Sequence, residues 1–149
     1  MATPSRELII ADIATVLATI ATPTFKTDVT TVERLAKVSD EVPDQQRPLI
    51  GIFTQDADSE YQPGGVIKKT LKVTLVCHVE KVSTETARAA ALADLLDDVI
   101  SALSADQSRG GNAYMTTFVT DETDEADPFG EGSMVVPLEV RFLRTQKSS

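Results

Sequence analysis

The stretch that decides the fold is LKVTLVCHVE, which runs from Leu71 to Glu80. Apolar side chains occupy every second position, and most of the positions between them are polar or charged. Successive side chains of a strand point to opposite faces of a sheet, so this period of two predicts a half-buried β-strand. Its apolar face comprises Leu71, Val73, Leu75, Cys77 and Val79.

A second strand of this kind is predicted near the C-terminus, where apolar side chains alternate from Met134 to Phe142. Pro137 lies inside this strand and has no N–H to donate, so we expect the strand to lie at a sheet edge or to carry a bulge. The remaining strands are predicted from β-branched or short apolar runs, and proline- or glycine-rich stretches predict loops. In chain order these are a strand at 30–38, a loop at 39–48, a strand at 49–53, a loop at 56–65 and a strand at 114–120.

Two amphipathic helices are predicted from apolar residues that recur at spacings of three and four. The first covers Glu7 to Ile20 and is limited by Pro23, because the residue before a proline disfavours the helical conformation. The second covers Thr84 to Leu103, with Ser83 as its predicted N-cap.

The element order is therefore α-β-β-β-α-β-β, within a single domain that spans residues 1–149. We predict an α+β fold with a mixed, mostly antiparallel sheet of about five strands packed against two helices. A chain of this length buries about 68–70% of the surface that it exposes when unfolded, which is enough for a substantial core.

Charge is the most uneven property of the chain, whose net charge is −9. Residues 121–131 contain six acidic side chains and no basic one. Proteins that hold nucleic acid through its phosphates need clustered lysine and arginine, so this class is disfavoured. No run reaches the roughly 18 to 20 apolar residues of a membrane span, and the N-terminus lacks the layout of a signal peptide, so we expect a protein made and kept in a cytoplasm.

No catalytic constellation is recognisable in the sequence. Cys77 and His78 are neighbours in a strand, so their side chains point to opposite faces and cannot form a nucleophile–base pair. The acids at Asp56, Asp58 and Glu60 start like a calcium loop, but Tyr61 stands where that loop requires glycine. Phosphate-binding glycine motifs are absent. We therefore expect no enzymatic activity, no metal site and no cofactor.

Several segments match, in order and spacing, a pattern found in one family of phage proteins. They are the helix at 7–20, Arg47-Pro48 before a short apolar strand, the acidic stretch 56–60, the long strand 67–80, the helix at 84–103, Arg109-Gly110-Gly111, and a last strand that ends at 138–144. In these features the chain resembles the tail terminator (tail completion) proteins of long-tailed phages over nearly all of its length.

The resemblance implies a structural virion protein of the tail or neck, made in the host cytoplasm. Such proteins form a hexameric ring that caps the tail tube, ends its growth and joins the tail to the head–tail connector protein, with both tube and connector as partners. DNA passes through the lumen without specific binding, and no membrane is involved. An acidic loop facing the lumen would repel phosphates, and we assign this position to Asp124, Glu125 and Asp127.

Candidate interface residues are apolar, aromatic or arginine side chains outside the predicted core, since such residues dominate protein interfaces. They are Arg47, Tyr61, Phe129, Val135 and Leu143. Local packing within the same loop is an alternative role for Arg47, Tyr61 and Phe129.

Three alternatives stay open. Within the phage hypothesis, the chain could be a head–tail connector or a tail tube subunit, although the lack of an extended insertion loop favours the terminator. Outside it, the chain could be an adaptor that binds a peptide or ligand with its sheet, which a stable monomer with a concave apolar pocket would favour. A small hydrolase would require two carboxylates at working distance in a cleft.

Overall fold

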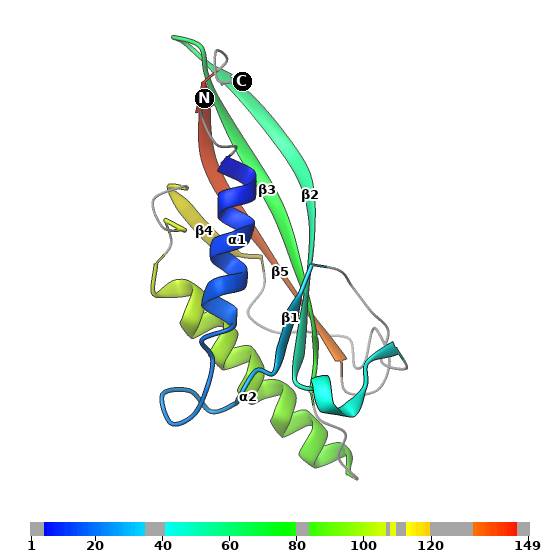
Figure 1. The fold of residues 1–149 in the computed structure, drawn as a ribbon. Coiled ribbons are helices and arrows are strands. Elements are labelled where there is room, and N and C mark those ends of the chain that lie inside the picture. The colour runs from blue at the N-terminus through cyan, green and yellow to red at the C-terminus, as the bar shows by residue number, and fades with distance from the viewer. Residues whose placement is uncertain are drawn as a thin grey trace.

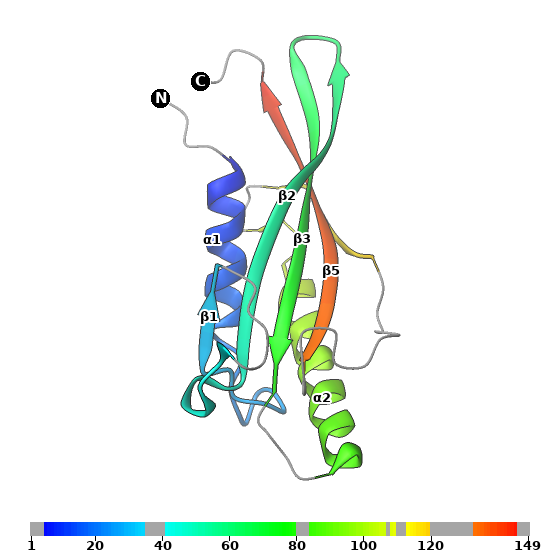
Figure 2. The same ribbon diagram turned by 90° about the vertical axis from the view of Figure 1, so that its right-hand side faces the viewer.

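A five-stranded sheet with two helices on one face forms the described part of the chain (Figures 1 and 2). The computed structural model describes residues 5–34, 41–79, 84–106, 108–109, 113–119 and 133–145. The helices are α1 (Ser5–Leu17) and α2 (Glu85–Ser104), with a short 3-10 helix η2 (Asp44–Gln46). The strands are β1 (Thr31–Glu33), β2 (Leu49–Gln62), β3 (Val66–His78), β4 (Met115–Phe118) and β5 (Ser133–Thr145).

The strand order across the sheet is β1-β2-β3-β5-β4. Only β1 and β2 run parallel, and the other three neighbouring pairs are antiparallel. The predicted α+β class, the mixed and mostly antiparallel sheet, the two helices and the element order are therefore confirmed. In both views α1 and α2 cover the same face of the sheet (Figures 1 and 2).

The core lies between the two helices and the covered sheet face. The alternation predicted for β3 and β5 is confirmed, because the apolar side chains at every second position of the two predicted patterns are all buried in this core. The helices contribute one buried stripe each. The principal residues are Ile9, Ile13 and Leu17 of α1, Leu95, Val99 and Leu103 of α2, Leu71 to Cys77 at alternate positions of β3, Val79 just after β3, and Met134 to Phe142 at alternate positions of β5.

The loop predicted at 56–65 is wrong, because β2 continues to Gln62. β2 pairs with β3 from Leu49 to Gln62, and the pairing is irregular between Asp56 and Asp58. Only the turn itself matches the prediction, and Gly64 and Gly65 supply the positive φ values of 85° and 78° that a tight turn requires. The β2–β3 hairpin, together with the end of β5, extends beyond both helices (Figures 1 and 2).

α1 ends at Leu17, three residues earlier than predicted. Just beyond that end, the Thr19 hydroxyl donates to the Val16 carbonyl at 2.6 Å. Threonine side chains that bond to the backbone compete with helical hydrogen bonds, which favours an early end of the helix. Ile20 is nevertheless buried in the core, so the apolar pattern was interpreted correctly although the boundary was not.

The N-cap of α2 is Thr84, one position after the predicted Ser83. The Thr84 hydroxyl accepts a hydrogen bond from the Ala87 N–H at 3.1 Å. Replacing an N-cap threonine by alanine removes the acceptor, so Thr84→Ala should lower the free energy of unfolding by about 1 kcal/mol. Chemical denaturation measures this change. Thr86→Ala, at an exposed position in the same turn, is the matched control and should leave stability unchanged or slightly raised.

Candidate interaction surface

The sheet face that the helices leave open carries several exposed apolar side chains. Strand pairing places Phe53, Thr74 and Pro137 in one row, next to the buried row that contains Leu75. Neighbouring residues of a strand point to opposite faces, so the row with Phe53 lies on the open face. The most exposed apolar residues of this face are between 43% and 60% accessible and comprise Phe53, Met115, Val119 and Leu143. This face is therefore the candidate interaction surface.

Polar contacts on this face link β4 to β5. Arg141 forms an ion pair with Glu139 at 3.0 Å and donates to the Thr117 hydroxyl at 3.2 Å. These contacts fix the guanidinium over the short strand β4. Charged and apolar side chains are therefore both present on the open face, which is common where a surface binds another protein.

Within the part of the chain that the structure describes, both edges of the sheet are only partly covered. There, β1 pairs with β2 only at residues 49–51, and β4 pairs with β5 only at residues 138–141. Among the described residues, no other strand pairs with the outer edge of β2 from Ile52 onward or with that of β5 after Arg141. Uncovered edges present unpaired backbone groups and can pair with another chain.

The two uncovered edges carry opposite charges. Asp56, Asp58 and Glu60 lie along the uncovered part of β2, whereas Arg144 lies on the uncovered part of β5, just after Arg141, which pairs with β4. The pairing register puts them at matching heights, because Tyr61 pairs with Ile67 of β3, which pairs with Arg144. One copy can therefore place its acidic edge beside the basic edge of a second copy without sliding along the strands.

Pro137 marks the place where the β4–β5 ladder ends. The Val119 N–H donates to the Pro137 carbonyl at 3.0 Å, and Pro137 has no N–H to complete that pair. The prediction that this strand lies at a sheet edge is wrong for its middle, because β4 pairs with residues 138–141. The physical reason is that proline removes a single hydrogen-bond donor from β5. β4 is short and its ladder with β5 ends next to Pro137, so the missing donor costs the sheet little.

The interface residues predicted from the sequence are distributed over different environments. Tyr61 is exposed, and it lies in β2 rather than in a loop. Leu143 is exposed on β5, and Val135 is half-buried on the same strand. Arg47 is only 3% exposed, and its Nη1 donates at 3.0 Å to the Val79 carbonyl, which lies 32 residues away in the chain and outside the loop of Arg47. Phe129, Asp124, Glu125 and Asp127 lie outside the described residues.

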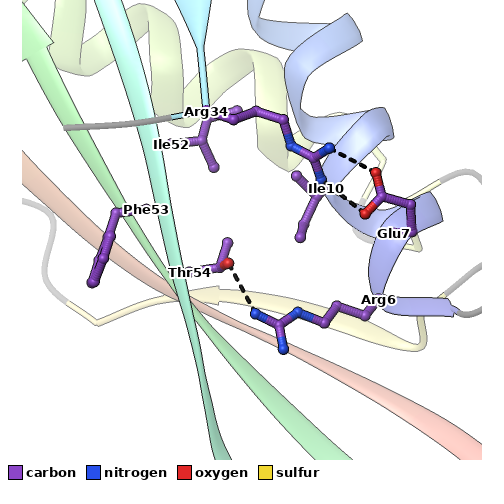
Figure 3. Close-up of a pocket in the computed structure, with 7 residues that line it drawn as sticks. All are labelled: Arg6, Glu7, Ile10, Arg34, Ile52, Phe53 and Thr54. Atoms are coloured by element: carbon purple, nitrogen blue, oxygen red, sulfur yellow. Dashed lines mark hydrogen bonds and ion pairs between the residues drawn. The ribbon is translucent and has the colours of Figure 1, made fainter.

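A hollow of about 330 Å³ lies between the start of α1 and β2, just past the end of β1. Two arginines from different segments line it (Figure 3). Arg34 contacts Glu7 through both Nη atoms, at 2.6 and 3.1 Å, and Arg6 donates to the Thr54 hydroxyl at 3.2 Å. The hydrogen bond from Arg34 lowers the pKa of Glu7, which keeps that carboxylate ionised. We call this site, lined by Arg6, Glu7, Arg34 and Thr54, the arginine hollow.

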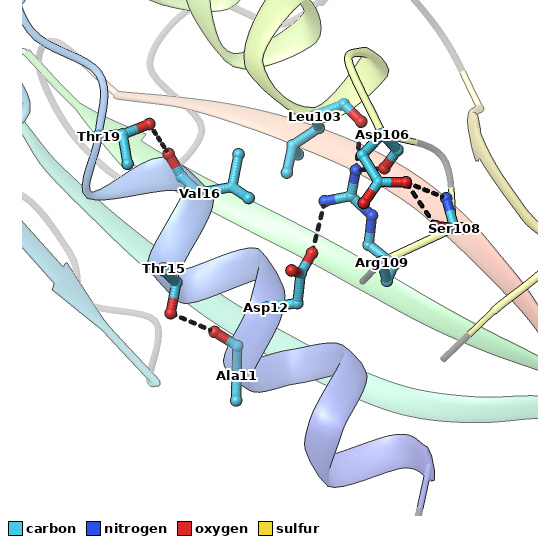
Figure 4. A network of polar contacts seen from close by, with 9 residues as sticks. All are labelled: Ala11, Asp12, Thr15, Val16, Thr19, Leu103, Asp106, Ser108 and Arg109. Carbon is cyan, nitrogen blue, oxygen red and sulfur yellow. Dashed lines mark hydrogen bonds and ion pairs between the residues drawn. The ribbon is translucent and has the colours of Figure 1, made fainter. Parts of the chain in front are cut away.

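A buried arginine that no sequence pattern indicated joins the two helices (Figure 4). Arg109 is fully buried, and its Nη1 lies 3.2 Å from Asp12 Oδ2 of α1. This distance makes an ion pair, although the two atoms are not aligned as a hydrogen bond. The Arg109 Nη2 also donates to the carbonyls of Leu103 and Asp106, at the end of α2. Arg109 therefore satisfies helix-end carbonyls that would otherwise lack donors.

A second buried charge attaches the segment after α1 to α2. Asp98 is buried, and its carboxylate accepts bonds from the N–H groups of Lys26 and Thr27 at 3.2 and 2.8 Å and from the Thr27 hydroxyl at 2.5 Å. An open hollow of about 400 Å³ lies beside these contacts. These contacts come from a segment about 70 residues away, so no local pattern of α2 indicates that Asp98 is buried.

The pair Cys77 and His78 offers no reactive site. Cys77 is buried in the core, and burial raises the pKa of its thiol to about 12, so the thiolate is disfavoured. His78 is buried on the opposite face, not exposed as strand histidines usually are. Within the described residues, no group of three histidine, cysteine or acidic side chains could hold a metal ion. None of the helices described here is long and apolar enough to cross a membrane.

Comparisons with known proteins add no family assignment. No protein-family model matches the chain. The search of curated proteins also found no match.

Proposed function

We propose that this chain is a structural protein that assembles head-to-tail into a ring, as a tail terminator of a long-tailed phage. The observation that carries the proposal is the pair of uncovered sheet edges with opposite charges at matching heights. A contact between two different edges is heterologous, and repeated rotation by the same angle closes such contacts into a ring. The order and spacing of the sequence segments supply the second support.

In this function the ring binds the end of the tail tube on one side and the head–tail connector on the other. Exposed apolar side chains on the open face and on the β2–β3 hairpin, such as Phe53 and Tyr61, are available for these contacts. DNA passes through the lumen without specific binding, and a net charge of −9 disfavours adhesion of phosphates. Six copies, assembly in the host cytoplasm and a place in the virion neck belong to the same proposal.

A head–tail connector or a tail tube subunit is the second candidate. The β2–β3 hairpin extends beyond both helices, so the lack of an extended segment no longer favours the terminator (Figure 2). All three functions use a ring, and they differ in which partner the ring binds. Binding to purified tail tubes at one end only would separate the terminator from a subunit that copolymerises along the tube.

Reversal of single charges on the two edges tests the ring contact. Glu60→Arg adds a positive charge to the acidic edge, which meets the basic edge of the next copy, and Arg144→Glu adds a negative charge to that basic edge. Each single variant should raise the protein concentration at which half of the chains assemble by several-fold, because every interface in the ring loses an attraction of about 0.2–1 kcal/mol and gains a repulsion. Light scattering coupled to size exclusion measures the shift.

The double variant is the decisive control for this prediction. Glu60→Arg combined with Arg144→Glu restores opposite charges across the interface and should recover much of the assembly. Lys26→Gln, which removes an exposed charge from a segment outside β2 and β5, should assemble like the unaltered chain. Equal assembly by all four variants would exclude the edge contact.

A further inference from the structure

The two short strands at the edges of the sheet cover different stretches of it. β1 lies beside residues 49–51 of β2. The pairing register connects β4 to β2 through β5 and β3, and it puts Phe118 level with Thr54. With Val119 added, β4 is level with residues 53–58 of β2. The two short strands therefore occupy adjoining stretches at opposite edges of the sheet and do not overlap.

Two copies side by side fit these short strands into one row. In a head-to-tail contact the β4 side of one copy faces the β2 side of the next. β4 can then lie beside residues 53–58 of the neighbour, directly after the neighbour's β1. The strand directions suit an antiparallel pair, because β4 and β3 each run antiparallel to β5, and β3 runs antiparallel to β2. The sheet then continues from one copy into the next.

Exposed apolar side chains match across this contact. Phe53 and Val119 lie at the two ends of one row of the open face, with Thr74 and Pro137 between them. They are 50% and 60% exposed, respectively. In the continued sheet, Val119 of one copy is directly opposite Phe53 of the next. Pairs of an aromatic and a β-branched side chain stabilise antiparallel strands, so the contact covers two apolar side chains that a single copy exposes.

The edge of β2 borders open space at this level. The arginine hollow is lined in part by Ile52, Phe53 and Thr54, so about 330 Å³ of space lies against this part of the strand. Figure 3 shows Phe53 pointing away from α1, toward the open face. On β4, Val119 donates to a carbonyl of β5, and neighbouring residues of a strand direct their backbone groups to opposite sides. The backbone groups of Phe118 therefore point away from β5, toward the next copy.

We infer that β4 of one copy pairs antiparallel with β2 of the next, with Val119 beside Phe53 and Thr117 beside Gln55. The inference rests on the proposed head-to-tail ring and names the strands that join its subunits. The partner is a second copy of this chain, because β4 has the level, the direction and the exposed side chain that the uncovered edge of β2 requires. Backbone hydrogen bonds supply the main attraction of such an added strand.

A disulfide between two variants with one new cysteine each tests the contact. One variant carries Phe53→Cys and the other Val119→Cys, and the only natural cysteine, Cys77, is buried. Directly opposite residues of an antiparallel pair have Cα atoms about 4.5–5.5 Å apart, which a disulfide can span. After oxidation, an equimolar mixture should run at the mass of a dimer on a non-reducing gel, whereas each variant alone should run as a monomer.

Two further mixtures test the register of the contact. Gln55→Cys mixed with Thr117→Cys should also give dimers, and this pair serves if a variant of the first pair does not fold. Thr74→Cys mixed with Val119→Cys should give none, since Thr74 lies in the same row but one strand farther from the edge. Equal amounts of dimer from Phe53→Cys alone, or from the mixture with Thr74→Cys, overturn the inference.

Truncation of the paired side chains tests their contact without a covalent bond. Phe53→Ala and Val119→Ala should each raise the protein concentration at which half of the chains assemble by up to about fivefold, the range of one cross-strand pair. Both changes in one chain should raise it by less than the product of the two factors, because the second change removes a contact that is already lost. Thr74→Ala is the control and should assemble like the unaltered chain. Factors that multiply fully would show that the two side chains do not meet.

The outcomes also separate this inference from the proposed function. Ring assembly by the unaltered chain, with no disulfide from either designed pair, would remove the strand pairing and leave the ring. Disulfides of the expected pattern, in open oligomers that bind no tail tube, would leave the strand pairing and remove the ring. A chain that stays monomeric and forms no disulfide contradicts both.

Discussion

Arg109→Met should lower the free energy of unfolding by about 3–5 kcal/mol, the cost of breaking a buried ion pair by removing one partner. Methionine keeps much of the volume of the arginine side chain but donates no hydrogen bond. The change leaves the Asp12 carboxylate without its cation and the carbonyls of Leu103 and Asp106 without the guanidinium. Because these contacts join α1 to the end of α2, both helices lose an anchor.

Equilibrium denaturation of the purified chain measures this effect. Arg141→Gln is the matched control, since its ion pair with Glu139 is partly exposed and should contribute less than about 1 kcal/mol. Equal losses from the two substitutions would contradict the account, because they would show that the buried position of Arg109 adds nothing.

Asp98→Ala should lower stability by about 3 kcal/mol. The carboxylate accepts three hydrogen bonds, and hydrogen bonds to a charged group contribute about 1.5–3 kcal/mol each before the remaining donors find water. The N–H groups of Lys26 and Thr27 lose their acceptor, so the segment after α1 detaches from α2. Hydrogen exchange at Thr27 should accelerate in the same variant.

Asp97→Ala is the control for this substitution. Asp97 pairs with the Lys26 ammonium at 3.0 Å, but both side chains are exposed, and exposed ion pairs contribute little. A loss of stability as large for Asp97→Ala as for Asp98→Ala would mean that burial of the carboxylate is not the cause.

The sequence predicts the fold where a core imposes a period on it. β3 and β5 alternate because one face of each packs against the helices, and both were predicted within a few residues. The far half of β2 gave no such pattern, because the hairpin extends beyond both helices, so neither of its faces packs against a helix there (Figure 1). Polar residues can then occupy successive positions of the strand from Thr54 to Gln62. The sequence of this stretch therefore resembles that of a loop.

The candidate site was harder to predict than the fold. Tyr61 and Leu143 could be named from their type and position, and both are exposed. Arg47 has the same residue type as many interface residues, but its guanidinium bonds to a backbone carbonyl 32 residues away in the chain. The arginine hollow combines residues from three segments that only the folded chain brings together. Single-sequence patterns carry no information on such contacts.

The mass of the purified chain over a concentration series, by light scattering coupled to size exclusion, tests the ring most directly. The account predicts a shift from monomer to six copies and six-fold rings in negative stain. A monomer at every concentration that also fails to bind either end of purified tail tubes would contradict it.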